Sequence, residues 1–155
     1  RIQLNNLDTK EVFFGFSNID PNILSLEDDV VYGTGTTISS NASDFVGFML
    51  CADLTDDEDW HAVYKGGTAS AVTASASLDL DDDAVAGEWQ VLKLVLKITG
   101  EVEWYIDEVL VKTLAGAVST STDLALALAV EAKGAANEEL DADYLLVRGS
   151  RDWTV

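Results

Sequence analysis

The sequence predicts an all-β protein built as a two-sheet antiparallel sandwich, and residues 88–113 are the main reason. In residues 91–98, leucines and an isoleucine alternate with valines and lysines, which is the two-residue period of a β-strand. The chain turns at Thr99-Gly100 and again at Asp107-Glu108, and the residues between these turns alternate between apolar and polar. Such a meander buries one face and needs a second sheet to cover it, so the whole chain is expected to be a sandwich.

The other predicted strands are short and separated by turn-forming or polar residues. Residues 68–77 are almost entirely Ala, Ser and Thr, whose propensities leave helix and strand undecided, and the surrounding strands favour a strand. In residues 124–130, the leucines and a valine are expected to be buried, with the intervening alanines on a flat outer face. About ten to eleven strands result, the remaining ones at residues 2–4, 12–16, 30–32, 45–52, 60–64 and 140–147, with loops at 33–37, 39–44, 53–59 and 79–83.

Length and charge limit the classes of partner. The 155 residues fit one domain, 1–155, whose hydrophobic core is large enough to stabilise it without a disulfide or a structural metal. The only cysteine, Cys51, has no partner within the chain. Against 28 Asp and Glu stand 9 Lys and Arg, and the formal net charge of -19 would repel nucleic acid. No apolar run approaches the roughly 20 residues of a membrane span, so neither nucleic acid nor a membrane is expected as a partner. Arg1 is not an initiator residue, so we expect a processed chain or part of a longer one.

Four pieces of sequence, in this order, resemble a known type of domain. They are VGFML at 46–50, W-x-A-V-Y at 60–64, G-E-W at 87–89 with G-E-V-E-W-Y-I-D at 100–107, and D-A-D-Y at 141–144 before Arg151-Asp152. The pattern resembles the concanavalin-like, laminin-G-like jelly rolls of structural proteins in tailed bacteriophages. This sequence departs from that pattern at Glu108, where a turn glycine is usual, and at Ala142, where a valine is usual.

The resemblance implies a jelly-roll sandwich with a non-enzymatic role in a virion, as a capsid decoration (cement), head-spike or fibre protein. Such a protein lies on the outer surface of the capsid or on an attached appendage. Its partners are capsid or other virion proteins and further copies of itself, for which a trimer is one arrangement. Scarce cations and an aromatic residue in an acidic chain suit a protein interface, as does the flat alanine face. The predicted interface residues are Arg148, Arg151, Trp153, Ala125, Ala127 and Ala129.

Two other functions come from the outward face of the second strand of the meander. Tyr105 is expected to face outward beside Glu103, which suits a carbohydrate-binding module of a receptor-binding or cell-surface protein in an extracellular location, with calcium held in a loop. Glu101 and Glu103 also form a carboxylate pair of the kind that a polysaccharide hydrolase uses, at a spacing of roughly 7 Å along the strand. No fuller hydrolase motif surrounds them, so no residue is predicted to be catalytic. Trp104 has the opposite parity and is expected in the core, as are most other tryptophans.

Two acidic loops are candidate calcium sites, and solvated surface charge is the competing interpretation. The second loop starts like an EF-hand, but Ala84 stands at the glycine position and Gln90 at the position of the bidentate glutamate, so that motif fails. The candidate ligands are Asp56, Asp57 and Asp59 in the first loop and Asp79, Asp81 and Asp83 in the second. The sole thiol, Cys51, and the sole imidazole, His61, lack a third orienting group, so a buried cysteine and a histidine at a strand edge are expected instead of a nucleophile and its base.

Overall fold

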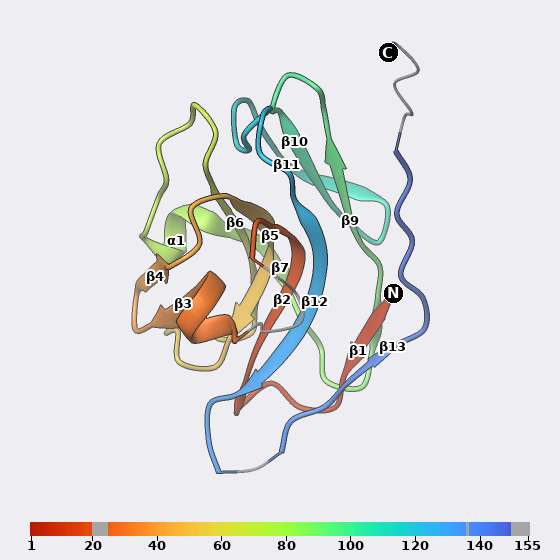
Figure 1. Ribbon diagram of the computed structural model, residues 1–155. Helices are drawn as coiled ribbons and strands as arrows, with labels where there is room; N and C mark the ends of the chain where they lie inside the picture. Colours follow the sequence, from red (N-terminus) through yellow and green to blue (C-terminus); the bar gives the residue numbers. More distant parts are fainter. Residues whose placement is uncertain (20–24, 136, 150–155) are drawn as a thin grey trace.

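The computed structural model describes residues 1–19, 25–135 and 137–149 and shows an all-β chain with several antiparallel sheets, none of them closed (Figure 1). This architecture is consistent with the predicted sandwich. A central sheet has five antiparallel strands in the order β12-β2-β5-β6-β7. In chain order these strands are β2 (Lys10–Ser17), β5 (Phe45–Cys51), β6 (Asp59–Lys65), β7 (Asp79–Asp83) and β12 (Ala125–Ala132).

Two three-stranded sheets, in the orders β13-β1-β8 and β11-β10-β9, form an outer layer. Their strands are β1 (Ile2–Leu4), β8 (Trp89–Gln90), β9 (Leu92–Leu96), β10 (Val102–Ile106), β11 (Val109–Leu114) and β13 (Leu140–Ala142). Only Val91 separates β8 from β9. Its N–H donates to Asp107 Oδ1 at 2.8 Å, and its carbonyl accepts the Asp107 N–H at 3.0 Å. The two sheets are therefore successive parts of one layer.

Two tryptophans join this outer layer to the central sheet. Trp104 in β10 donates its indole N–H to the carbonyl of Gly47 in β5 at 2.9 Å, and Trp60 in β6 donates to Gln90 Oε1 in β8 at 2.9 Å. Both rings are fully buried, as predicted for Trp104. Because the two indoles reach across the core in opposite directions, each layer fixes the position of the other.

The opposite face of the central sheet is covered by short elements (Figure 1). These are the helical turn η1 (Leu26–Val30), the hairpin of β3 (Val31–Thr34) and β4 (Thr37–Ser40), and the turn α1 (Ser75–Leu78). Glu131 in β12 accepts the backbone N–H groups of Leu26 and Glu27 at 2.7 and 3.1 Å, which attaches η1 to the sheet. The alanine side of β12 is thus not an open outer face: Ala127 is buried and Ala129 half-buried.

Two glycines allow a phenylalanine to pack directly on the central sheet. Gly15 in β2 and Gly47 in β5 are register partners. A Cβ on either would lie within 3 Å of the Phe13 ring and of backbone atoms. Side-chain volume at these positions is therefore excluded by the ring and by the neighbouring strand.

Several sequence predictions were wrong in detail. Residues 68–74 are a loop and residues 75–77 are part of turn α1, whereas residues 79–83, predicted as a loop, form strand β7. The last strand ends at Ala142 instead of residue 147. Ile98 is 92% exposed because β9 ends at Leu96, and Trp89, expected in the core, is 37% exposed. Within the described residues, no helix has the length and apolar character to cross a membrane.

Candidate functional site

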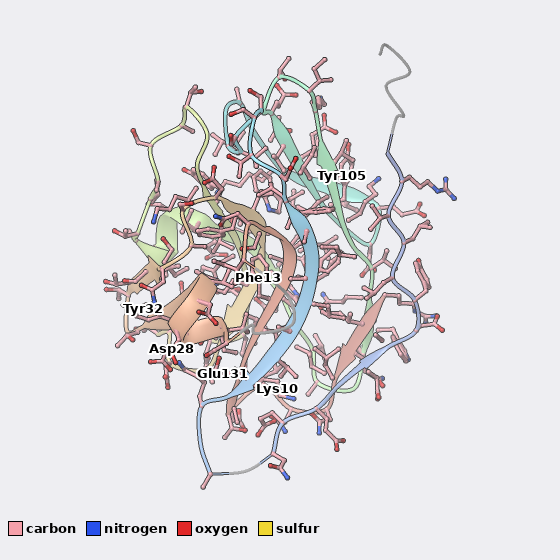
Figure 2. The ribbon with its side chains drawn as sticks, in the orientation of Figure 1. Lys10, Phe13, Asp28, Tyr32, Tyr105 and Glu131 are labelled. Carbon is pink, nitrogen blue, oxygen red and sulfur yellow. The ribbon has the colours of Figure 1, made fainter. Side chains whose placement is uncertain are left out.

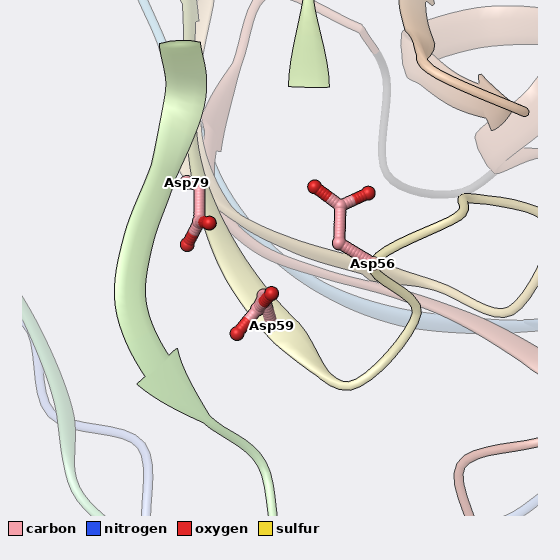
Figure 3. Close-up of side chains that lie close together, drawn as sticks. All are labelled: Asp56, Asp59 and Asp79. Atoms are coloured by element: carbon pink, nitrogen blue, oxygen red, sulfur yellow. The ribbon is translucent and has the colours of Figure 1, made fainter. Parts of the chain in front are cut away.

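The structure brings the two predicted acidic loops together into one cluster, which we call the aspartate cluster. It consists of Asp56 in the β5–β6 connection, Asp59 at the start of β6 and Asp79 at the start of β7. One carboxylate oxygen of each lies within 4.8 Å of the other two, and all three residues are half-buried. Figure 3 shows the side chains of Asp59 and Asp79 on neighbouring strands with Asp56 on the loop beside them.

Strand register explains this convergence. In the β6–β7 pair, Asp59 is opposite Asp83 and His61 is opposite Asp79, so these side chains project from the same face of the sheet. Turn α1 covers that face, and its buried Ser75 donates a hydroxyl hydrogen bond to Asp56 Oδ1 at 3.2 Å. The sequence alone could not show the convergence because β7 was predicted as a loop.

Burial, together with the neighbouring carboxylates, raises the pKa of Asp59 to about 7. Burial is the largest cause, followed by its side-chain hydrogen bond with Asp83 and by the charges of Asp79, Asp83 and Asp56. Among the described residues, no lysine or arginine nitrogen lies within 4.0 Å of the aspartate cluster. The negative charge of the cluster is therefore not balanced by a direct ion pair with either residue type.

The other predicted metal ligands lie outside the aspartate cluster. Asp57 is half-buried in the β5–β6 connection, and Asp81 is exposed, with its own N–H donating to Asp79 Oδ1 at 2.7 Å. Asp83 is not one of the three clustered residues, but it is the register partner of Asp59 and raises the pKa of that carboxyl. The predicted set of six thus reduces to three residues that could share one ion.

Glu103 and Tyr105, the predicted carbohydrate residues, are engaged by neighbouring side chains on the outer layer, where Figure 2 labels Tyr105. Tyr105 donates its hydroxyl to Glu103 Oε2 at 2.8 Å, and the Lys93 ammonium lies 3.7 Å from the centroid of its ring. Lys97 bonds both Glu101 and Glu103, at 2.6 and 2.5 Å. The bond from Lys97, then that from Tyr105, lowers the pKa of Glu103, whereas a general acid needs a raised pKa. One face of the Tyr105 ring is covered by Lys93.

Cys51 and His61 do not have the properties of a nucleophile and its base. Burial, followed by the charge of Glu11, raises the pKa of Cys51 to about 11, and its Sγ faces the carbonyl of Gly33 at 3.8 Å. A reactive thiol needs a lowered pKa. His61 is fully buried and lies on β6 between β5 and β7, so the prediction of a strand-edge position was wrong.

The predicted interface lies partly outside the described residues, as Arg151 and Trp153 do. Arg148 is described and exposed, Ala125 is also exposed, and Ala127 and Ala129 lie beneath the covering elements. Directly before Arg148, the four apolar residues 144–147 are 49–63% exposed. Sequence reasoning missed this surface, although an uninterrupted apolar run beside an arginine breaks the alternation of a half-buried strand and was a usable signal.

Residues 144–148 border a groove of about 210 Å³ at the open edge of the sandwich. Its floor includes Phe14, Phe16 and Leu126 from the central sheet, and β9 forms one wall. Among the residues that the structure describes, strand β9 pairs with β10 alone, and no described strand pairs with its other edge. None of the described lining residues is acidic, and three are basic: Arg1, Lys93 and Arg148.

Comparisons with protein-family models, with curated proteins and with solved structures found no match to this chain.

Proposed function

We propose that this chain is a non-enzymatic structural domain of a tailed-phage virion, a capsid decoration (cement) or head-spike protein with a jelly-roll fold. In this proposal it sits on the outer surface of the capsid or on an appendage and attaches through protein contacts. The groove along residues 144–148 is the observation that carries the proposal. A chain with 28 Asp and Glu among 155 residues would place several acids in a groove of this size by chance, yet the described lining has none.

The chemistry of the groove fits an extended segment of a partner protein. Its apolar floor offers burial to apolar side chains, and the free edge of β9 offers backbone hydrogen bonds, so a partner could add a strand beside it. Arg148 would attract an acidic segment, whereas the Arg1 guanidinium is paired with Asp143 at 3.2 Å and the Lys93 ammonium lies over the Tyr105 ring. We therefore propose a capsid-protein segment with apolar residues and acidic flanks as the occupant.

The family resemblance supports the virion setting through the fold. Residues 46–50 lie in β5, residues 60–64 in β6 and residues 102–106 in β10. These three pieces build the core of both layers, which is what a resemblance of fold would preserve. The Asp107-Glu108 turn forms without glycine, with φ values of 47° and 70°.

Co-sedimentation with capsids prepared without this protein tests the proposal. Val147, which lines the groove, is 57% exposed, and Val109, outside it, is 62% exposed, so Val147→Asp and Val109→Asp are matched substitutions. We expect Val147→Asp to weaken capsid binding at least tenfold and Val109→Asp to leave it unchanged, with equal melting temperatures. Binding that survives Val147→Asp, or that both variants lose equally, would exclude the groove as the attachment site.

Truncation after Gly149 tests residues 150–155 separately. Loss of capsid binding in the truncated chain, with the melting temperature retained, would assign part of the contact to Arg151 and Trp153. Absence of binding by the intact protein to any capsid preparation would remove the virion proposal itself.

A further inference from the structure

We propose that residues 151–155, which lie outside the described residues, return along the groove as an added strand of the outer layer, between β9 and residues 144–148. This inference concerns the free chain and does not depend on the proposed role in a virion. It gives the groove an occupant from the chain itself, which a partner segment would have to displace.

The groove lies where the outer layer has room for one more strand. Strand β1 pairs with β8 on one side and with β13 on the other. Past the start of β1, the chain continues from β8 into β9 and from β13 into residues 143–149, with no described strand between these two neighbours (Figure 1). Because β1 is antiparallel to both β8 and β13, a strand that continues its line would be antiparallel to β9.

Backbone hydrogen bonds show which groups of β9 face the groove. Residues at both ends of this strand bond toward β10: the Asp107 N–H donates to the Val91 carbonyl at 3.0 Å, and the Lys97 N–H donates to the Glu101 carbonyl at 2.9 Å. Backbone groups alternate between the two edges of a strand, and the β9–β10 register is regular. The even-numbered residues Leu92, Leu94 and Leu96 therefore direct their N–H and C=O groups away from β10, into the groove.

The apolar side chains below the groove are incompletely covered. Val12, Phe14 and Phe16 project from one face of β2. Val12 is fully buried, whereas Phe14 and Phe16, which line the groove, are half-buried. Leu94 in the wall and Leu126 in the floor are half-buried as well. Inward-facing apolar side chains of a further strand would complete the burial of this floor.

The sequence after residue 148 has the pattern that such a strand needs. Gly149-Ser150 is a pair of the Gly-X type that favours a two-residue hairpin turn, and a Cβ on Gly149 would meet no atom within 4 Å. In residues 151–155, Trp153 and Val155 are two positions apart, and the residues on either side of Trp153 are polar. A strand with Trp153 and Val155 facing inward would present apolar side chains to the floor and polar ones to solvent.

Amide hydrogen exchange, measured by NMR on the full chain and on a chain truncated after Gly149, tests the proposal. We expect the Leu94 N–H to exchange at least tenfold faster after truncation, because a returning strand would accept its hydrogen bond. The N–H groups of Lys93 and Val95 face β10 and should stay slow in both chains. Their protection shows that the truncated chain is folded.

Two single substitutions separate the inward from the outward side of the segment. Trp153→Ser removes a side chain predicted to face the floor, and it should speed exchange at Leu94 as truncation does. Asp152→Ser introduces the same residue one position earlier, on the outward side, and should leave Leu94 protected. In the full chain, nuclear Overhauser effects are expected between the Trp153 ring and the Phe14 or Phe16 ring.

The proposal is wrong if Leu94 exchanges at the same rate in the full and truncated chains, or if Trp153→Ser and Asp152→Ser have equal effects. Protection of Leu94 that falls on dilution, together with a dimer in sedimentation, would overturn the return within one chain and assign the groove to a second copy. Protected Leu94 in a chain that binds no capsid would support this inference and count against the virion role alone.

Discussion

Lys10 and Glu11 are consecutive residues of β2, both fully buried, and they point to opposite faces of the central sheet. Figure 2 labels Lys10 at the end of this strand. Each forms an ion pair with a residue between β12 and β13: Lys10 Nζ lies 3.2 Å from Glu138 Oε2, and Glu11 Oε2 lies 3.0 Å from Lys133 Nζ. The two pairs hold the β12–β13 connection from both sides of the sheet.

Replacing Lys10 by methionine should destabilise the fold by about 3–5 kcal/mol, because the buried carboxylate of Glu138 would lose its cation. Lys10 also donates to Asn5 Oδ1 at 2.5 Å and to the carbonyl of Glu139 at 2.7 Å. Urea denaturation measures the loss. The double variant with Glu138→Gln should recover part of it, and a loss below about 1 kcal/mol for Lys10→Met alone would contradict this account.

Glu11 should make stability depend on pH. Burial raises its pKa from 4.5 to about 7, against the opposing pairing with Lys133 and with help from the charges of Glu131 and Glu27. For Lys133, by contrast, burial lowers the pKa, but pairing with Glu11 outweighs it and the pKa is raised. Cys51 and Asp53 also lie near this pair.

Because the folded-state pKa of Glu11 is the higher one, the folded state binds more protons between pH 4.5 and about 7. This contribution to the free energy of unfolding is complete below pH 4.5 and is lost as the pH rises through 7. The resulting decrease in the free energy of unfolding is at most about 3 kcal/mol. Urea titrations at pH 5 and pH 8 should therefore show a smaller difference for Glu11→Gln than for the wild type. Glu88→Gln, on the surface, should retain the wild-type difference.

Trp104→Phe should cost about 1–3 kcal/mol, since it removes an indole N–H and leaves the Gly47 carbonyl without that donor. Trp89 is partly exposed and contacts Arg1, whose guanidinium carbon lies 4.8 Å from the ring centroid. Trp89→Phe should accordingly cost less than about 1 kcal/mol. Equal losses in the two variants, measured by urea denaturation, would show that the bond across the layers contributes little.

Salt should stabilise the protein in the presence of chelator. The net charge of -19 makes the compact chain repel itself, and screening reduces that repulsion. We expect the melting temperature to rise between low salt and roughly 1 M NaCl. A flat profile would mean that local pairing, not long-range repulsion, sets the electrostatic stability.

The sequence predicted those elements whose two faces differ in polarity. Val102, Trp104 and Ile106 are all buried, while Glu103 and Tyr105 on the opposite face are half-buried, as their alternation indicated. The prediction failed where composition is uniform. Residues 68–77 offer no apolar periodicity, and the aspartates of β7 resemble a loop because their pairing with β6 is not encoded in their own hydropathy.

The individual residues of the candidate sites could be predicted from the sequence, but which of them lie together in space could not. Asp56, Asp59 and Asp79 were each expected as metal ligands, but their convergence depends on the register of β6 against β7. The groove depends on five segments distant in sequence: residues 1–2, β2, residues 91–94, Leu126 in β12 and residues 144–148. Long-range pairings of this kind set the geometry of both places, and they leave no local pattern in the chain.

The placement of β1 has a consequence for how the protein is made. Strand β1 lies between β8 and β13, with Ile2 opposite both Gln90 and Ala142. Residues 2–4 are synthesised long before β8 and β13, so this strand cannot complete its pairing until both of these later strands have been made. We therefore expect the outer layer to be completed late, as a slow step of folding.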